Sequence, residues 1–184
     1  RPDIAPRIRW LPYFLNPDTP ESGEPYRPFL ERKFGGPEKL AQLWAQIAAA
    51  GRTAGIEFAF ERIEVRANTL RAHRLIHRAQ MAGDAGALVE RLFAAQFLQG
   101  ENVGDAAVLA RLAGECGDDE AAALAYLRSE ADADAVRAQA ERGQRMGISG
   151  VPFFIFDGRY GLGGAQPPEV LLDALRRSLL PPTP

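Results

Sequence analysis

The sequence predicts an α/β fold in which a long block of helices separates the strands of a small sheet. Three observations support this prediction. An aromatic, β-prone run lies near the beginning of the chain at residues 8–15, and an apolar run at residues 153–156 follows directly after Pro152. Between them, residues 37–146 carry apolar side chains mainly at helical spacing. With 184 residues, the chain suits one domain, or one small fold with a large insertion.

The N-terminal region predicts one strand, a loop and a helix. Residues 8–15 carry three aromatic side chains and predict a strand, and Pro12 within it indicates an edge position or a bend. Residues 16–28 are rich in proline, glycine and acidic side chains, which predicts an irregular loop. Pro37 suits the first position of a helix, which we expect to end near Gly51.

Further helices are predicted from residues that can cap a helix before an apolar periodic segment. Residues 55–66 are ambiguous. The capping candidates are Asn68 or Thr69, Asp84, Asp105, and Asp118 or Asp119, and their helices extend to about residues 82, 98, 115 and 128. A last helix of this block covers 133–146 and stops at Gly147.

The C-terminal region predicts a β-hairpin followed by a helix. The Asp157-Gly158 pair lies between two β-prone runs, which is a strong signal for a tight two-residue turn. Pro152 suits the entry to the first strand, because proline cannot donate a hydrogen bond to a sheet. The second strand reaches Gly163, and a closing helix covers about residues 168–179.

Composition excludes several classes of protein. A net charge of −2 and a hydrophobic content of 46% describe an ordinary globular chain, without the basic excess that nucleic-acid binding requires. No apolar run approaches the length of a membrane span. Cys116 is the only cysteine, which excludes a disulfide-stapled scaffold. No targeting segment is visible, so the cytoplasm is the default expectation.

Six segments resemble motifs of one protein family in their order and spacing. They are residues 10–18, 32–35, 68–73, 92–97, 147–154 and 163–168. Together they resemble the DsbA-like thioredoxin superfamily, especially its FrnE-type branch, with 2-hydroxychromene-2-carboxylate isomerases and kappa-class glutathione transferases as relatives. The resemblance implies a thioredoxin-like fold with a large all-helical insertion. Residues 1–34 and 147–184 would form the thioredoxin-like core, and residues 35–146 the helical insertion domain.

The family pattern also implies a part that the sequence does not contain. Members begin with a strand and then a Cys-X-X-Cys motif at the start of a helix, where the helix N-terminus lowers the pKa of a thiol. The sequence begins where that helix should be ending. We therefore expect the first strand, the first helix and the catalytic thiols to be missing from it.

The resemblance implies a substrate site around a proline loop. The Val151–Pro152 peptide bond is expected to be cis, with the backbone of Val151 turned outward to pair with a bound peptide or glutathione. Pro152 is the catalytic-loop residue, and Gly150 and Val151 are expected to bind substrate. Asn68 and His73 are expected to line the cleft between the helical insertion and the core.

Other candidate residues are interpreted as structural. Cys116 lies at a predicted helix end among acidic residues, which raise the pKa of a thiol and oppose thiolate chemistry. His73 and His77 share a helix face, but no third ligand has suitable spacing, so no metal is expected. Five aromatic side chains fit core packing better than ligand stacking. They are Trp10, Tyr13, Phe14, Phe93 and Phe97.

Three functions remain open. The first is a thiol–disulfide oxidoreductase or isomerase of the DsbA-like FrnE type, which acts on a substrate protein through a mixed disulfide. The second is a glutathione-dependent isomerase or transferase, which needs only a serine or a single cysteine at the missing position. The third is an inactive thioredoxin-like binding module. No cofactor is expected apart from glutathione as a substrate or co-substrate, no nucleic-acid or membrane partner is expected, and a homodimer is left open.

Overall fold

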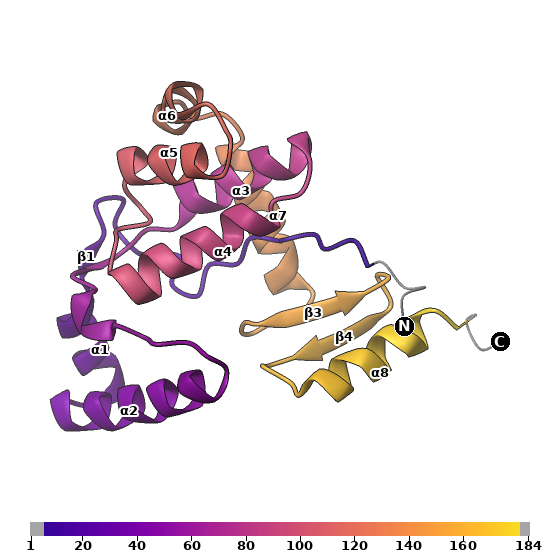
Figure 1. Cartoon of the computed structure of the whole chain (residues 1–184), viewed down its shortest axis with the longest axis horizontal. Coiled ribbons are helices and arrows are strands. Elements are labelled where there is room, and N and C mark those ends of the chain that lie inside the picture. The colour runs from indigo at the N-terminus through magenta and orange to yellow at the C-terminus, as the bar shows by residue number, and fades with distance from the viewer. Residues whose placement is uncertain (1–5, 181–184) are drawn as a thin grey trace.

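The computed structural model describes residues 6–180, which form a helical body, two further helices beside it and a small β-hairpin unit (Figure 1). In chain order, the elements are β1 (Glu24–Pro25), α1 (Tyr26–Phe34), α2 (Pro37–Thr53), a 3-10 turn (Phe60–Arg62), β2 (Val65–Arg66), α3 (Leu70–Ala82), α4 (Gly86–Ala94), a π-helical turn (Ala95–Gln99), α5 (Ala106–Glu115), α6 (Glu120–Arg128), α7 (Ala133–Arg145), β3 (Phe153–Phe156), β4 (Tyr160–Gly163) and α8 (Pro168–Ser178). Helices α3 to α7 make up the body, and β3, β4 and α8 form a unit at the lower right of Figure 1.

The main hydrophobic core lies within the helical body. Its buried members come chiefly from α3, α4, α5 and α6, and they are Ala72, Leu75, Leu88, Leu92, Ala95, Val103, Leu109, Ala110, Leu112, Ala113, Ala123 and Leu127. The predicted caps begin two of these helices. The Asp105 carboxylate accepts hydrogen bonds from the first turn of α5, and the Asp119 carboxylate does the same for α6. The predicted helical insertion is confirmed, except that it is not all-helical, since the two-residue strand β2 lies within it.

One buried arginine joins α3 to the turn between α6 and α7. Arg74 is 2% exposed, and its guanidinium donates to four backbone carbonyls. Two of these bonds are short, at 2.8 Å to Ser129 and 2.7 Å to Ala131. Because the last carbonyls of a helix have no partner within it, a side chain from another helix satisfies them here.

The predicted hairpin is confirmed. Strand β3 pairs antiparallel with β4, from Phe153 opposite Gly163 to Phe156 opposite Tyr160. The two turn residues, Asp157 and Gly158, have φ of 52° and 66°. The Arg159 N–H donates to the Phe156 carbonyl at 3.0 Å, and positive φ at both central positions of this turn is the pattern of type I′, with Arg159 as one further loop residue before the Phe156–Tyr160 pair.

The prediction of a strand at residues 8–15 is wrong. The structure has irregular backbone there, and the backbone N–H and carbonyl of Trp10 bond to the side chain of Gln80 in α3. The Trp10 N–H donates to Oε1 of Gln80 at 2.6 Å, and Nε2 of Gln80 donates to the Trp10 carbonyl at 3.0 Å. A strand exists only where a neighbouring strand pairs with it, and Pro12 has no N–H to offer.

Helix α1 lies partly in a segment that the composition predicts as loop. Its Pro28 occupies the first turn, where a proline is tolerated because the N–H would be unpaired in any case. The helix ends at Gly35, which has a left-handed φ of 85°. The ambiguous residues 55–66 contain the 3-10 turn and β2, which pairs antiparallel with β1.

Candidate functional site

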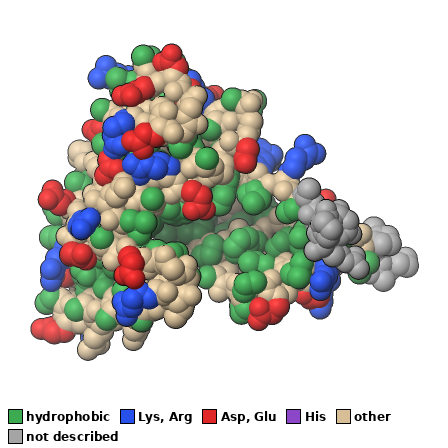
Figure 2. All heavy atoms as spheres, in the orientation of Figure 1, with side chains coloured by type: hydrophobic (Ala, Val, Ile, Leu, Met, Phe, Trp, Pro, Cys, Tyr) green, Lys and Arg blue, Asp and Glu red, His purple; other side chains and the backbone are tan. Residues whose placement is uncertain are grey.

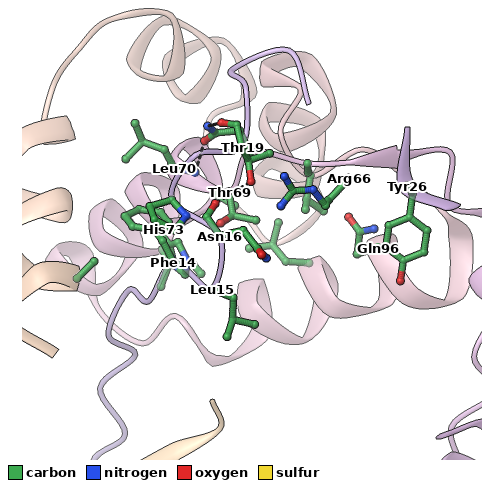
Figure 3. Close-up of a pocket in the computed structure, with 18 of the residues that line it drawn as sticks. Phe14, Leu15, Asn16, Thr19, Tyr26, Arg66, Thr69, Leu70, His73 and Gln96 are labelled. Carbon is green, nitrogen blue, oxygen red and sulfur yellow. Dashed lines mark hydrogen bonds between the residues drawn. The ribbon is translucent and has the colours of Figure 1, made fainter. Parts of the chain in front are cut away.

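A cavity of about 700 Å³ lies between α1, α3, α4 and α7. Residues 14–19 of the N-terminal segment close one side of it, and the π-helical turn contributes to the wall. Figure 3 shows that the labelled side chains come from segments far apart in the sequence and converge on one space. The same face of the molecule is hollowed, with hydrophobic side chains in the depression (Figure 2).

His73 contributes from α3 to the cavity wall. Its ring meets that of Phe14 edge-on, with 5.4 Å between the ring centroids. Burial lowers the pKa of His73 to about 4, against the opposing effect of a hydrogen bond with the Tyr13 backbone. The imidazole is therefore neutral at pH 7 and a weak proton acceptor.

Asn68 lies in the same wall, directly before α3. Its Nδ2 donates to the Thr19 carbonyl at 2.8 Å, and its Oδ1 accepts from the Leu70 N–H at 3.1 Å. Both ends of the amide thus hold local structure, since one fixes the N-terminal loop and the other forms a turn with the first residue of α3. The structure brings Asn68 and His73 to one cavity, and their contact with substrate stays a prediction.

Gln96 is a wall residue that the sequence analysis did not single out. It belongs to the π-helical turn, and its Oε1 is buried without a hydrogen-bond partner among the described residues. Tyr26 of α1 lies close by in Figure 3, and burial raises the pKa of its hydroxyl. A π-helical turn leaves no distinct periodic signal in the sequence, although such turns occur often at functional sites.

The interpretation of the aromatic residues as core is wrong for Phe93. Phe14, Phe93 and Phe97 line the cavity, and Phe93 is 53% exposed. The rings of Phe93 and Phe97 are stacked, with centroids 6.2 Å apart. Phe93 follows the buried Leu92, so it lies about 100° around α4, at the edge of the apolar stripe. Trp10 and Tyr13 are only partly buried.

The loop before β3 forms a second candidate site. The Val151–Pro152 peptide bond is cis, Val151 is 49% exposed, and Gly150 is half-buried. The Pro152 carbonyl accepts from the Gly164 N–H at 2.8 Å, so the loop is held to the end of β4. Within residues 6–180, the Val151 N–H and carbonyl make no hydrogen bond. They are therefore available to a partner chain.

Comparison with known proteins agrees with this architecture. The family model of the DSBA-like thioredoxin domain matches residues 4–176. The chain belongs to the DsbA-like thioredoxin family. A crystal structure of a "putative protein disulfide isomerase" from Nitrosomonas europaea is similar, with a TM-score of 0.61 and 23% identity over 78% of this chain and 72% of that chain. At this identity the likeness shows a shared fold, and no curated protein matches the sequence.

Cys116 lies away from both candidate sites of this DsbA-like chain. It is exposed at the C-terminal end of α5. Partial burial and the neighbouring Glu115 raise the pKa of the thiol, while Arg91 acts in the opposite direction. The predicted direction is confirmed, although desolvation contributes more than the acidic neighbours. A raised pKa leaves little thiolate for exchange chemistry at pH 7.

His77 takes no part in the cavity that contains His73. In the part of the chain that the structure describes, no three histidine, cysteine or acidic side chains come together as metal ligands would. None of the described helices has both the length and the apolar composition needed to cross a bilayer.

Proposed function

We propose that this DsbA-like protein is a thiol–disulfide oxidoreductase or isomerase of the FrnE type. Family membership supports thiol–disulfide exchange as the class of reaction. The observation that carries the proposal is the exposed loop at Gly150–Pro152, where the backbone of Val151 has no partner among the described residues. An extended substrate chain would pair with these groups, as a strand adds to a sheet edge.

The catalytic thiols are proposed to come from a Cys-X-X-Cys motif N-terminal to the residues of this chain. In the reducing direction, one thiolate attacks a sulfur of the substrate disulfide, forms a mixed disulfide and releases the other substrate sulfur as a thiolate. The second cysteine then attacks its neighbour in the mixed disulfide. The substrate leaves with two thiols, and the enzyme keeps the disulfide.

The hairpin unit has a free edge at which the strand that would precede this motif could pair. Strand β3 pairs with β4 on one side, and its other edge has no partner strand among the described residues. A further strand beside β3 would pair with the free backbone groups of that edge.

The test uses the full-length protein and a disulfide-bonded substrate such as insulin. Val151→Pro removes the backbone N–H that pairs with substrate, and we expect it to raise KM at least severalfold. Val151→Ala keeps that N–H and is the matched control, with KM close to the parent value. Cys116→Ala should leave exchange unchanged, because this thiol lies outside the site. A full-length protein that carries a cysteine pair and shows no exchange would overturn the proposal.

The glutathione-dependent alternative uses the same loop at Gly150–Pro152. Assays of the same full-length protein distinguish it from thiol–disulfide exchange. A serine in place of the first cysteine, together with glutathione binding and no disulfide exchange, would favour it. An inactive binding module would show neither activity. A cytoplasmic location stays a prediction, and a homodimer stays open.

A further inference from the structure

The Tyr13 side chain links the N-terminal segment to the start of the loop that contains the cis peptide bond. Its hydroxyl donates to the Ile148 carbonyl at 3.0 Å, although 135 positions separate the two residues in the sequence. Ile148 lies between the end of α7 and the loop at Gly150–Pro152. The hydroxyl of Tyr13 thus reaches the backbone just before the proposed substrate site.

This loop is attached to the rest of the protein at both ends. At the downstream end, the Pro152 carbonyl accepts from the Gly164 N–H at 2.8 Å. At the upstream end, the Ile148 carbonyl accepts from Tyr13. Residues 149–151 make no backbone hydrogen bond to other described residues. The direction in which they present their N–H and carbonyl groups therefore depends on the two attachments.

The Tyr13 ring is held in place by helices α3 and α7. The ring and the Ile148 side chain both lie over Gly143 of α7, each 3.9 Å from the point where a Cβ at that position would stand. The next residue, Phe14, meets the ring of His73 in α3 edge-on. Tyr13 is partly buried, which shelters its hydrogen bond from competing water. The hydroxyl is thus a fixed donor.

We propose that Tyr13 is a positioning residue for the disulfide substrate, an inference that rests on the proposed function. Its hydroxyl fixes the orientation of the peptide group that follows Ile148, and with it the upstream end of the loop at Gly150–Pro152. A backbone held in its binding conformation loses less conformational freedom when the substrate chain pairs with it, so it binds that chain more tightly. The hydroxyl itself takes no part in the transfer of electrons or protons.

The experiment compares two disulfides as substrates of the full-length protein, with dithiothreitol as the reductant. Tyr13→Phe keeps the ring and removes only the hydroxyl. We expect it to raise KM for insulin about fivefold, the net effect of one hydrogen bond, and to leave kcat unchanged. Bis(2-hydroxyethyl) disulfide has no peptide group that could pair with Val151. Its rate of reduction should therefore be the same in the parent protein and in Tyr13→Phe.

The matched control is Tyr126→Phe, which removes a hydroxyl that donates to another backbone carbonyl, that of Arg74, at 3.1 Å within the helical body. It should lower the melting temperature and leave the kinetics of both disulfides unchanged. The inference is overturned if Tyr13→Phe leaves KM for insulin unchanged. It is also overturned if Tyr13→Phe slows both disulfides equally, because an equal loss is an effect on the thiols or on the fold.

Amide hydrogen exchange tests the same attachment without enzymatic activity. The Ile148 N–H donates to the Gly143 carbonyl at 3.2 Å, which protects it. In Tyr13→Phe, this amide should exchange at least severalfold faster than in the parent protein. Equal protection would overturn the inference whether or not the protein exchanges disulfides. A parent protein with a cysteine pair and no exchange would instead overturn the proposed function, so the two failures are distinguishable.

Discussion

Replacement of Arg74 by methionine should cost this protein a large part of its stability. The side chain is buried, and methionine fills a similar volume without the guanidinium donors. Of the four carbonyls that it contacts, Tyr126 O also accepts from Ser129, and the bond to Leu127 is long at 3.4 Å. The carbonyls of Ser129 and Ala131 accept no other hydrogen bond among the described residues.

Ser129 and Ala131 are exposed residues, so the variant loses two partly buried hydrogen bonds from a charged donor, at about 1.5–2 kcal/mol each, which gives an expected loss of about 3–4 kcal/mol. For a chain of this size, that corresponds to a fall in melting temperature of about 10 °C. Urea unfolding followed by circular dichroism measures the difference directly. Arg74→Lys keeps the charge but loses the planar fork of donors. Its free energy of unfolding should therefore lie between that of the parent protein and that of Arg74→Met.

The matched control is Arg78→Met, one turn further along α3. Its guanidinium pairs with the Asp118 carboxylate at 2.6 Å on a partly exposed surface. Such pairs contribute about 0–1 kcal/mol, so Arg78→Met should be nearly neutral. The reasoning is refuted if Arg74→Met loses less than about 1 kcal/mol, or if the two variants lose equal amounts.

Three further predictions follow from single positions. His73 has a pKa of about 6.5 in the unfolded chain and about 4 in the folded chain, so the unfolded state binds the proton first as pH drops. The free energy of unfolding should therefore fall by up to about 3 kcal/mol between these two pH values. His73→Gln should flatten this pH profile. Gln96→Met removes an unpaired acceptor, so it should raise the free energy of unfolding by about 1 kcal/mol, measured as a higher urea midpoint. Gly100→Ala should lower the melting temperature far more than Gly117→Ala. Both glycines have positive φ, but only at Gly100 would the added Cβ lie against the Arg62 carbonyl. Equal melting temperatures of the two variants would contradict this.

Local chemistry accounts for most of what could be predicted from the sequence. Asp105 and Asp119 mark helix starts because their carboxylates satisfy nearby N–H groups, and Asp157-Gly158 marks a turn because both residues tolerate positive φ. Residues 8–15 could not be assigned in the same way. Their aromatic, β-prone side chains suit a strand, but strand formation depends on a partner far away in the sequence, and here a side chain of α3 takes that role.

The cavity was only partly predictable. Asn68 and His73 were expected in a cleft from the family resemblance, and the structure places both in the cavity wall. Lys33 and Gln96 were not singled out as site residues, because their positions depend on α1 and on a π-helical turn. The sequence signals for α1 were Pro28 in its first turn and Gly35 after its end, and the polar composition of the segment obscured them.

The pairing of Gln80 with Trp10 makes the N-terminal segment a candidate for independent local opening. One amide side chain satisfies both backbone groups of Trp10, so the attachment to α3 at that point depends on a single residue. Segments held by few interactions open at a lower free energy than a hydrophobic core. Phe14 lies in this segment and also forms part of the cavity wall. Local opening there would widen the entrance to the cavity while α3 to α6 stay folded, and amide hydrogen exchange would show lower protection in residues 8–15 than in those helices.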